Sequence, residues 1–369
     1  MRDGTAADRF FRTYQAQFVG ATPVQPFVPP PDADDESTEE ATPQIDRTVE
    51  MPEAYWKAIA LTEQPANENE IPKRFIDGSQ KGEPVLCIRS PQGYPIPMVL
   101  SEVGAVALES VGRTFERKFV ALERVLTFYA DPFPWEEVEA LSLDLLNRPE
   151  LKLRILPAAP PDFSKHSPFD YEAMRSQAHN RAQREMEMME RLALASAKDV
   201  PTLVDGPIHR VTSKPGAKLL VGVVKTHPTN YLHDQGWRTL LNLKPGQRTP
   251  VFRYESGGTG GGNLPVATWY LKLAGGPRLA PNWGYVRVEV PWSQFEERVP
   301  DPKKECGFID RLSRWLIDAR CRASSYARMP VSLEPIVRAE EALKPLFTPT
   351  GLLANRLHRT AGLTEMEWE

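Results

Sequence analysis

Cysteine is scarce in this chain, and its scarcity excludes two classes of protein. Cys87, Cys306 and Cys321 are the only thiols among 369 residues, and no two of them have CxxC spacing. Disulfide frameworks and structural zinc sites need more thiols at closer spacing. We therefore expect neither, and we interpret the three thiols as small buried apolar residues.

Long apolar runs are missing as well. No stretch approaches the roughly 20 apolar residues that span a bilayer, and the start of the chain lacks the apolar segment of a secretory signal. The sequence predicts a cytoplasmic protein that does not contact a membrane. The net charge is −4 rather than strongly positive, so we expect any contact with nucleic acid to be local.

A nucleotide-binding P-loop is also absent. The Gly-rich run 257–262 is not followed by the Lys-Ser or Lys-Thr pair of a Walker A motif. We interpret this run as a hairpin tip, and we expect any energy-dependent step to come from a partner protein.

The composition is that of a globular protein, with 41% hydrophobic and 25% charged residues. The N-terminal part differs from the rest, because an aromatic helix is predicted near residues 9–18 and a proline-rich acidic stretch follows it. We divide the chain into an N-terminal docking helix (1–20), a proline-rich acidic linker (21–50) and one large domain (51–369). We interpret the arm as a segment that docks onto a sister subunit or another protein.

The large domain has the pattern of an α/β protein. A strand at 74–77 is expected to form a hairpin with a strand at 82–89. The strand at 285–290 alternates Val with Arg or Glu, which is typical of a half-exposed strand. The other predicted elements are a short helix at 52–61, strands near 104–108, at 202–205 and at 218–225, and helices at 171–198, 312–323 and 335–346.

Two Asp-Gly pairs are the most informative feature. Asp77-Gly78 and Asp205-Gly206 each follow a short apolar run suited to a buried strand, and glycine lets the backbone turn away. A carboxylate at the end of a core strand is costly to bury without a metal or a charged partner. On adjacent strands, the two carboxylates would reach one divalent cation, as in metal-dependent phosphodiester chemistry. The alternative is that both are ordinary Asp-Gly turns.

The order of these elements is that of a ribonuclease H-like domain, and the motifs resemble the NurA nuclease family. The pieces that carry the resemblance are 76–79, 203–207, 221–225, 287–291 and 334–340. The resemblance implies an α/β fold with a ribonuclease H-like mixed sheet flanked by helices, here with an N-terminal extension. It also implies a Mn²⁺- or Mg²⁺-dependent, two-metal-ion DNA nuclease, a homodimer, and a hexameric HerA-type ATPase as partner in DNA end processing or defence. Exonuclease (5′–3′) and endonuclease action both remain open.

The resemblance also suggests the site residues. Asp77 and Asp205 take the two Asp roles, and a helix Glu completes the metal ligands. Family spacing favours Glu187, the border of the apolar stripe favours Glu190, and Glu185 remains a further alternative. We favour Glu187. Glu340 corresponds to a ligand position in the family's last helix, where His or Asp is often found.

Basic residues are dense after the second Asp-Gly pair. Lys225 ends a predicted strand and is a candidate contact for a phosphate or for transition-state charge. We expect the stretch to bind DNA, as single strands or duplex ends, in a salt-dependent and sequence-independent way. The candidate DNA contacts are Arg210, Lys214, Lys218, Lys225, His227 and Arg238. Interleaved with them, Tyr231, Trp237 and Phe252 are candidates for base stacking, with core packing as the alternative.

Two other functions remain compatible with the sequence. The chain could be a catalytically silent ribonuclease H-like module that binds nucleic acid or serves as a scaffold subunit. It could also be a nuclease of the same fold that acts on RNA, since no residue identifies a reader of the 2′-hydroxyl.

Overall fold

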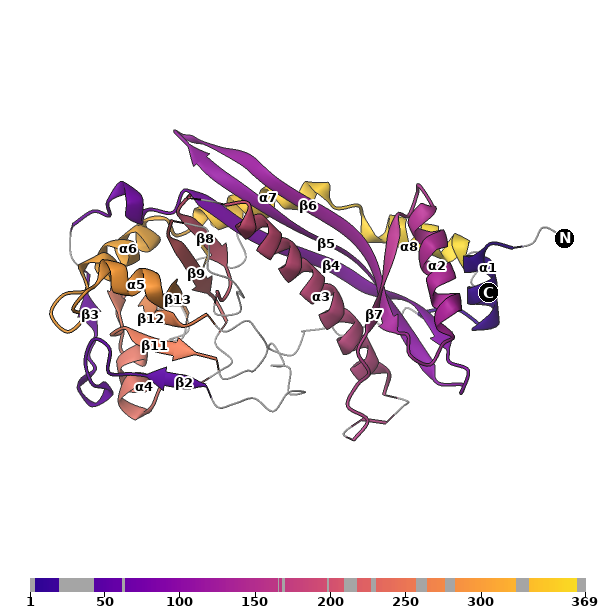
Figure 1. Cartoon of the computed structure of the whole chain (residues 1–369), viewed down its shortest axis with the longest axis horizontal. Coiled ribbons are helices and arrows are strands. Elements are labelled where there is room, and N and C mark those ends of the chain that lie inside the picture. Colours follow the sequence, from indigo (N-terminus) through magenta and orange to yellow (C-terminus); the bar gives the residue numbers. More distant parts are fainter. Residues whose placement is uncertain are drawn as a thin grey trace.

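The computed structural model has a large mixed sheet flanked by helices (Figure 1). It describes residues 4–19, 43–61, 64–164, 166–167, 170–197, 199–208, 218–226, 230–256, 264–275, 283–322 and 332–363. Within these residues the sheet has 13 strands, and its main path runs β2-β11-β12-β13-β9-β8-β4-β5-β6-β7. None of the described helices is long and apolar enough to cross a membrane.

The centre of the sheet has the strand order expected for a ribonuclease H-like domain. Three antiparallel strands come first: β4 (Arg74–Arg89), β5 (Pro95–Val111) and β6 (Thr114–Tyr129). After the long helix α3 (Tyr171–Ala195), strand β8 (Thr202–Asp205) lies parallel to β4. Strand β9 (Leu220–Val224) then lies parallel to β8. The expected order of antiparallel strands, helix and second carboxylate-bearing strand is confirmed.

Helices cover both faces of β4 and β5. On one face, α3 packs a stripe of small or unbranched residues, including Ala178, Ala182 and Met189, against the sheet. The small side chains let the helix axis approach closely. On the other face lies α7 (Glu334–Leu343), with Ala339 and Leu343 packed on Val106 and Leu108. Since both faces are covered, β5 is buried over most of its length, and its segment 103–108 is a continuous apolar run.

The sheet is extended at both ends (Figure 1). Beyond β9 lie β13 (Tyr285–Pro291), β12 (Val266–Lys272), β11 (Phe252–Glu255) and β2 (Gln44–Asp46). At the opposite end, α1 (Ala6–Thr13) packs on α2 (Trp135–Asn147). Phe10 and Phe11 of α1 are buried in the same core as Phe128 and Phe133. The aromatic side chains of the N-terminal helix are therefore enclosed by this chain itself.

The remaining elements are short or peripheral. They are β1 (Gln17–Phe18), η1 (Glu53–Tyr55), β3 (Ile59–Ala60), η2 (Glu68–Glu70), β7 (Leu153–Ala158), α4 (Asp234–Leu241), β10 (Gln247–Arg248), α5 (Trp292–Arg298), α6 (Gly307–Asp318), η3 (Lys344–Leu346) and α8 (Thr350–Thr360).

Several expected elements were wrong. Segments 74–77 and 82–89 do not form a hairpin, because they are two parts of the single strand β4. The segment 52–61 is not a helix but holds η1 and β3. The helix expected at 312–323 begins at Gly307 and ends at Asp318. The strand expected to be half exposed, β13, is buried throughout, because Arg287 and Glu289 form an ion pair inside the protein.

Candidate active site

Asp77 and Asp205 lie side by side. Strands β4 and β8 are parallel neighbours, with Phe75 opposite Leu203 and Ile76 opposite Val204. The next residue on each strand is the aspartate, and the two carboxyl groups lie close enough for the charge of Asp205 to raise the pKa of Asp77. The expectation that the two Asp-Gly pairs lie on adjacent strands is confirmed.

Both carboxyl groups point to the face of the sheet covered by α7. Asp77 is paired across the strands with Val106, whose side chain packs on α7. Directly opposite residues of adjacent strands point to the same face. Asp205 follows Val204 as Asp77 follows Ile76, so its side chain takes the same side.

The two glycines have different roles, and one differs from the expectation. Gly206 has φ +127°, a conformation that only glycine adopts without strain, and β8 ends there. At Gly78 the chain does not turn, since β4 continues to Arg89. A Cβ on Gly78 would stand 2.5 Å from Oε1 of Glu190. Glycine at position 78 therefore provides space for a carboxylate rather than a turn.

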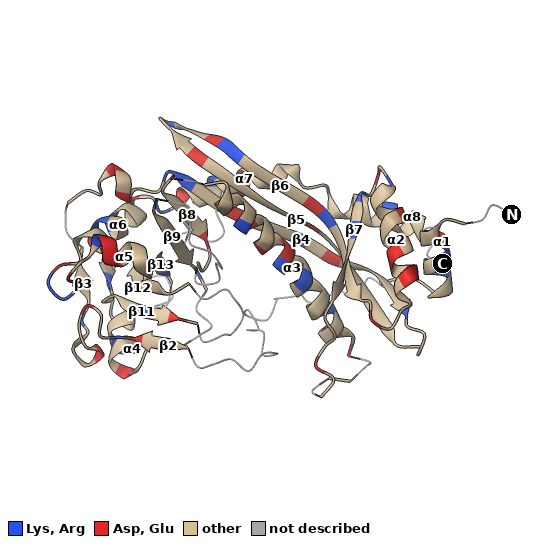
Figure 2. Ribbon diagram, viewed as in Figure 1, with Lys and Arg blue, Asp and Glu red and all other residues tan. Residues whose placement is uncertain are grey.

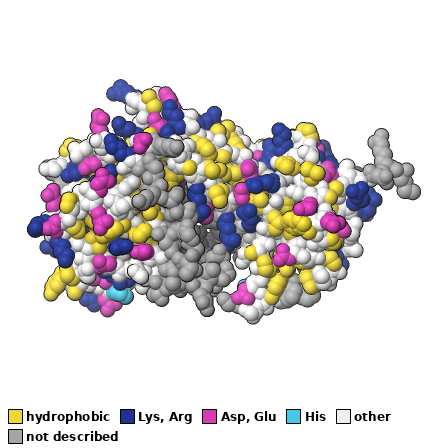
Figure 3. Space-filling model, viewed as in Figure 1, with side chains coloured by type: hydrophobic (Ala, Val, Ile, Leu, Met, Phe, Trp, Pro, Cys, Tyr) yellow, Lys and Arg dark blue, Asp and Glu magenta, His cyan; other side chains and the backbone are white. Residues whose placement is uncertain are grey.

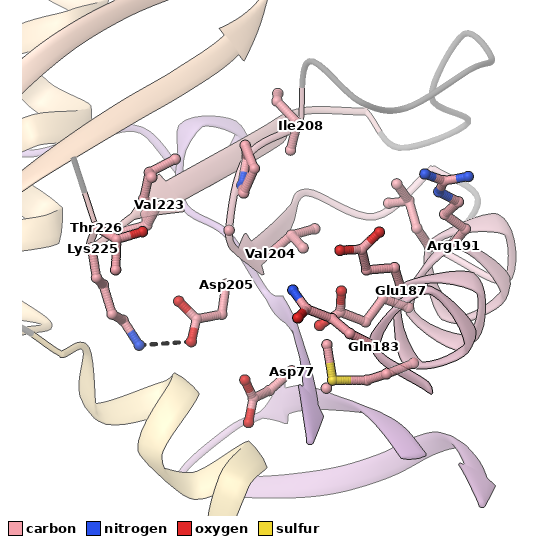
Figure 4. Close-up of a pocket in the computed structure, with 17 residues that line it drawn as sticks. Asp77, Gln183, Glu187, Arg191, Val204, Asp205, Ile208, Val223, Lys225 and Thr226 are labelled. Atoms are coloured by element: carbon pink, nitrogen blue, oxygen red, sulfur yellow. Dashed lines mark hydrogen bonds and ion pairs between the residues drawn. The ribbon is translucent and has the colours of Figure 1, made fainter. Parts of the chain in front are cut away.

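The glutamates of α3 approach the same point from the other face. The carboxylate of Glu190 packs directly on Gly78. Glu187 lies one turn earlier and lines the same cavity (Figure 4). Glu185 instead forms ion pairs with Arg154 and Arg181. The structure thus places Glu187 and Glu190 at the cavity and directs Glu185 to a separate charge cluster.

A cavity of about 390 Å³ lies where β8 and β9 end while β4 continues. The carboxyl ends of strands at a topological switch point are the usual ligand sites of open α/β sheets. Figure 4 shows the aspartates on one side of the cavity and the α3 side chains on the other. Its lining residues that carry a charge are Asp77, Glu187, Glu190, Arg191, Asp205 and Lys225.

Burial and repulsion within this cluster raise the pKa values of two of its carboxyl groups. Burial, together with the nearby charge of Asp205, raises the pKa of Asp77 well above its ordinary value. The pKa of Glu190 is raised well above its ordinary value by burial and by the charges of Asp77, Asp205 and Glu187. Neither Asp77 nor Glu190 forms an ion pair with a described residue. The carboxylates therefore outnumber the cations that the described part of the chain places there.

Lys225 and Glu340 lie on the aspartate side. The Nζ atom of Lys225 donates to Oδ2 of Asp205 at 2.7 Å, the dashed contact in Figure 4. Glu340, on α7, is near enough for its charge to contribute to the raised pKa of Asp77, and its carboxylate pairs with Lys344 at 2.9 Å. It does not line the cavity. Lys225 is thus part of the cluster, and Glu340 is at its margin.

The expected DNA-binding residues are dispersed. Arg210, Lys214 and His227 lie outside the described residues. Lys218 is exposed and donates to Asn69, and Arg238 is exposed on α4; neither lines the cavity.

Other members of the same stretch belong to the core. Arg248 is 1% exposed and pairs with Glu50 and Asp310. Tyr231 and Phe252 are buried as well. Core packing, the alternative to base stacking, therefore describes both aromatic residues.

A divalent cation is compatible with the chemistry of the donors but not with a preformed cage. Carboxylate oxygens are ligands that Mg²⁺ and Mn²⁺ prefer. Burial and mutual repulsion raise the pKa of Asp77 and Glu190, and a bound cation would relieve the repulsion. Within the described ranges, no three His, Cys, Asp or Glu side chains converge closely enough to hold an ion as they stand.

Sequence reasoning missed Arg191. It lines the cavity and forms no hydrogen bond or ion pair with a described residue. Figure 2 shows both signs of charge interspersed along α3, and in Figure 3 basic side chains gather over the same helix. The available signal was its spacing of four residues after Glu187, which places both on one helical face.

Comparisons with known proteins give little further information. No family model matches the chain, and no curated protein matches it. Among solved structures, the chain is similar to the NurA nuclease from Sulfolobus solfataricus, with 13% sequence identity and a TM-score of 0.35, over 86% of this chain and 90% of that chain. At so low a similarity, the function has to be argued from the site.

Proposed function

We propose that this chain is a metal-dependent nuclease that hydrolyses DNA at the cavity between β4, β8 and α3. One observation carries the proposal: Asp77, Asp205 and Glu190 line the same cavity where β8 ends, and the pKa values of Asp77 and Glu190 are raised. Buried carboxylates without cationic partners cost stability. A purely structural site would pair them, as the same protein does elsewhere, so a positively charged ligand is the natural complement.

Asp77 and Asp205 would hold Mn²⁺ or Mg²⁺ from one face of the sheet, and Glu190, with Glu187 beside it, from the other. We now favour Glu190 over Glu187 as the ligand on α3, because Gly78 leaves the space that it fills. When bound as a pair, such ions would supply activation of a water and stabilisation of a leaving oxygen. Glu340 would not be a metal ligand, and its charge would only help to raise the pKa of Asp77.

The two basic side chains that line the cavity, Lys225 and Arg191, would bind the phosphate backbone of the substrate. Lys225 lies beside Asp205 and would contact a phosphate oxygen. Arg191, across the cavity on α3, would contact a neighbouring phosphate with its planar guanidinium. Both contacts neutralise phosphates without reading bases, so binding would be independent of sequence and weakened by salt.

The wider assignment follows from the resemblance of the sequence motifs to the NurA family. It includes a homodimer, a hexameric HerA-like ATPase as partner, and a role in DNA end processing or defence. Because Phe10 and Phe11 are buried in this chain's own core, α1 would not offer them to a partner.

The decisive test is cleavage of end-labelled single-stranded DNA, duplex DNA and RNA in Mn²⁺, Mg²⁺ or EDTA. We expect metal-dependent cleavage of DNA, reduced about 10³-fold or more in Asp77→Asn and Asp205→Asn, because each removes several kcal/mol of charge stabilisation. Glu190→Gln should be similarly impaired. Glu185→Gln is the matched control, since this residue lies on the same helix but pairs with Arg154 and Arg181.

A second function is favoured by a different observation. Lys225 neutralises Asp205, and no three donors in the described part of the chain form a ready metal cage. A catalytically silent module that binds nucleic acid would have these properties. It predicts DNA binding without cleavage in any metal, with or without the ATPase, and that result would replace the nuclease proposal. If the protein cleaved RNA but not DNA, the proposed substrate would change from DNA to RNA.

A further inference from the structure

The segment that follows Asp205 folds back over strand β9. The N–H of Gly206 donates to the carbonyl of Val223 at 2.9 Å. At Gly222, a Cβ would stand 2.8 Å from the carbonyl oxygen of Gly206 and 2.9 Å from a methyl group of Ile208. The absence of a side chain at position 222 therefore lets the segment 206–208 pack directly on the backbone of β9.

The buried carboxylate of Glu289 holds this segment against β9. Glu289 is 0% exposed and lies directly opposite Gly222 on the neighbouring strand β13. Its Oε2 atom accepts a hydrogen bond from the N–H of Ile208 at 2.7 Å, and its Oε1 atom pairs with Arg287. The guanidinium of Arg287 in turn lies 4.6 Å from the ring centroid of Tyr231.

This arrangement is costly and is not needed for a stable strand. Apolar residues of similar volume often replace a buried ion pair without loss of stability, and sometimes with a gain. What an apolar pair cannot provide is a directional acceptor for the Ile208 amide. A charge-assisted hydrogen bond is also stronger and geometrically stricter than a neutral one.

We propose that Glu289 is a positioning residue of the candidate active site, which fixes Asp205 beside Asp77 by holding the segment 206–208 over Gly222. The role in catalysis rests on the proposed nuclease function. Strand β8 has only four residues and ends at Asp205, so its own ladder gives that carboxylate little support. Repulsion between Asp77 and Asp205 works against their close approach, and Glu289 supplies a restraint that opposes it.

Two variants separate positioning from general stability. Glu289→Leu removes the acceptor. Arg287→Met combined with Glu289→Gln removes both charges but keeps an amide oxygen that can accept from Ile208. Glu102→Leu is the matched control: this glutamate is 6% exposed on β5, is paired with Arg124 at 3.0 Å, and does not line the cavity.

We expect Glu289→Leu to lower kcat about 10- to 100-fold, the usual effect of losing a residue that orients a ligand, with KM nearly unchanged. The double variant should recover most of kcat, and Glu102→Leu should lose thermal stability without losing kcat. Equal kcat in Glu289→Leu and Glu102→Leu would overturn the proposal, as would a double variant no better than Glu289→Leu.

Amide hydrogen exchange gives a readout that needs no cleavage. In Glu289→Leu, peptides covering 202–208 should exchange faster than in the wild type, while in Glu102→Leu they should not. Unchanged exchange would overturn the proposal even if kcat fell. If the wild type cleaved nothing, the nuclease function would fail, and the exchange experiment would still decide whether Glu289 holds this segment.

Discussion

Two clusters of buried charge in this protein differ in how they are neutralised. Around Arg248, one guanidinium contacts Glu50 at 2.8 Å and Asp310 at 2.6 Å. The guanidinium is in direct contact with both carboxylates, so each has a cationic partner within the protein. Burial nevertheless raises the pKa of Asp310 above its ordinary value. In the cavity, Asp77 and Glu190 form no ion pair with a described residue, and their pKa values are raised.

The difference separates a structural cluster from a candidate functional one. The Arg248 cluster joins the segment before η1 to helix α6. If Arg248 is removed, Glu50 and Asp310 are left without a positively charged partner. The cavity is already unbalanced, so losing a carboxylate there relieves repulsion. Perturbed titration together with a cavity is a sign of function. Burial alone is not, since Arg248 is the more deeply buried.

The largest effect on stability is expected from Arg248→Met. It leaves Glu50 and Asp310 buried without their cation, and breaking a buried pair in this way costs about 3–5 kcal/mol. Thermal or urea unfolding of the wild type and the variant would measure this loss. The folded fraction of Arg248→Met should have the same kcat as the wild type.

Two outcomes would contradict that view of the Arg248 cluster. One is a variant as stable as the wild type. The other is a triple variant, Arg248→Met, Glu50→Met and Asp310→Leu, that is no more stable than Arg248→Met alone. An all-apolar cluster should recover most of the lost stability, because it buries no unpaired charge.

A smaller effect, on catalysis rather than stability, is expected from Gly78→Ala. The added Cβ would collide with the Glu190 carboxylate, whose Oε1 atom would be 2.5 Å away, and would displace that carboxylate from its place against Gly78. We expect kcat to fall about 10- to 100-fold, as for other changes that misplace a ligand. Gly351→Ala on α8 is the control, since a Cβ there meets nothing within 4 Å. Equal kcat in the two variants would show that Glu190 is not required.

The sequence predicted the parts of the site that depend on local pattern. The apolar runs before Asp77 and Asp205 identified neighbouring strands, and the stripe of α3 identified the helix between them. Contacts between distant residues could not be predicted in this way. Gly78 resembles a turn glycine until Glu190 is placed against it. The border of the apolar stripe favoured Glu190, but the family spacing favoured Glu187, and the local pattern could not decide between the two.

Burial of charge was the other failure. In β13, alternation of Val with Arg287 and Glu289 has the pattern of a strand with one wet face. The ion pair and the Ile208 amide satisfy both charges inside the protein, and neither partner is visible from the local pattern. The same applies to Arg248, which in the sequence is one more member of a basic stretch.

The smallest expected effect is the change of the free energy of unfolding with pH in the absence of metal. Asp77 and Glu70 should contribute to this change with opposite signs. The pKa of Asp77 is raised, so between its ordinary value of 3.8 and the raised value the folded state binds more protons than the unfolded state. The free energy of unfolding therefore falls as pH rises through this window, by about 1.4 kcal/mol for each unit between the two pKa values. Asp77→Asn should remove that fall and unfold at a higher temperature than the wild type at pH 7 in EDTA.

Glu70 provides the comparison. Burial favours its neutral form, but hydrogen bonds from Arg311 and from the Asn67 backbone outweigh burial, and its pKa is lowered. Its contribution is present above the ordinary pKa and is lost as pH falls through the lowered one. Glu70→Gln should therefore destabilise the protein at pH 7, where Asp77→Asn stabilises it. Thermal unfolding from pH 4 to 8 measures both. If Asp77→Asn also lost stability, the carboxylate would be held by a favourable partner, and the contrast between neutralised and unneutralised clusters would fail where it matters most.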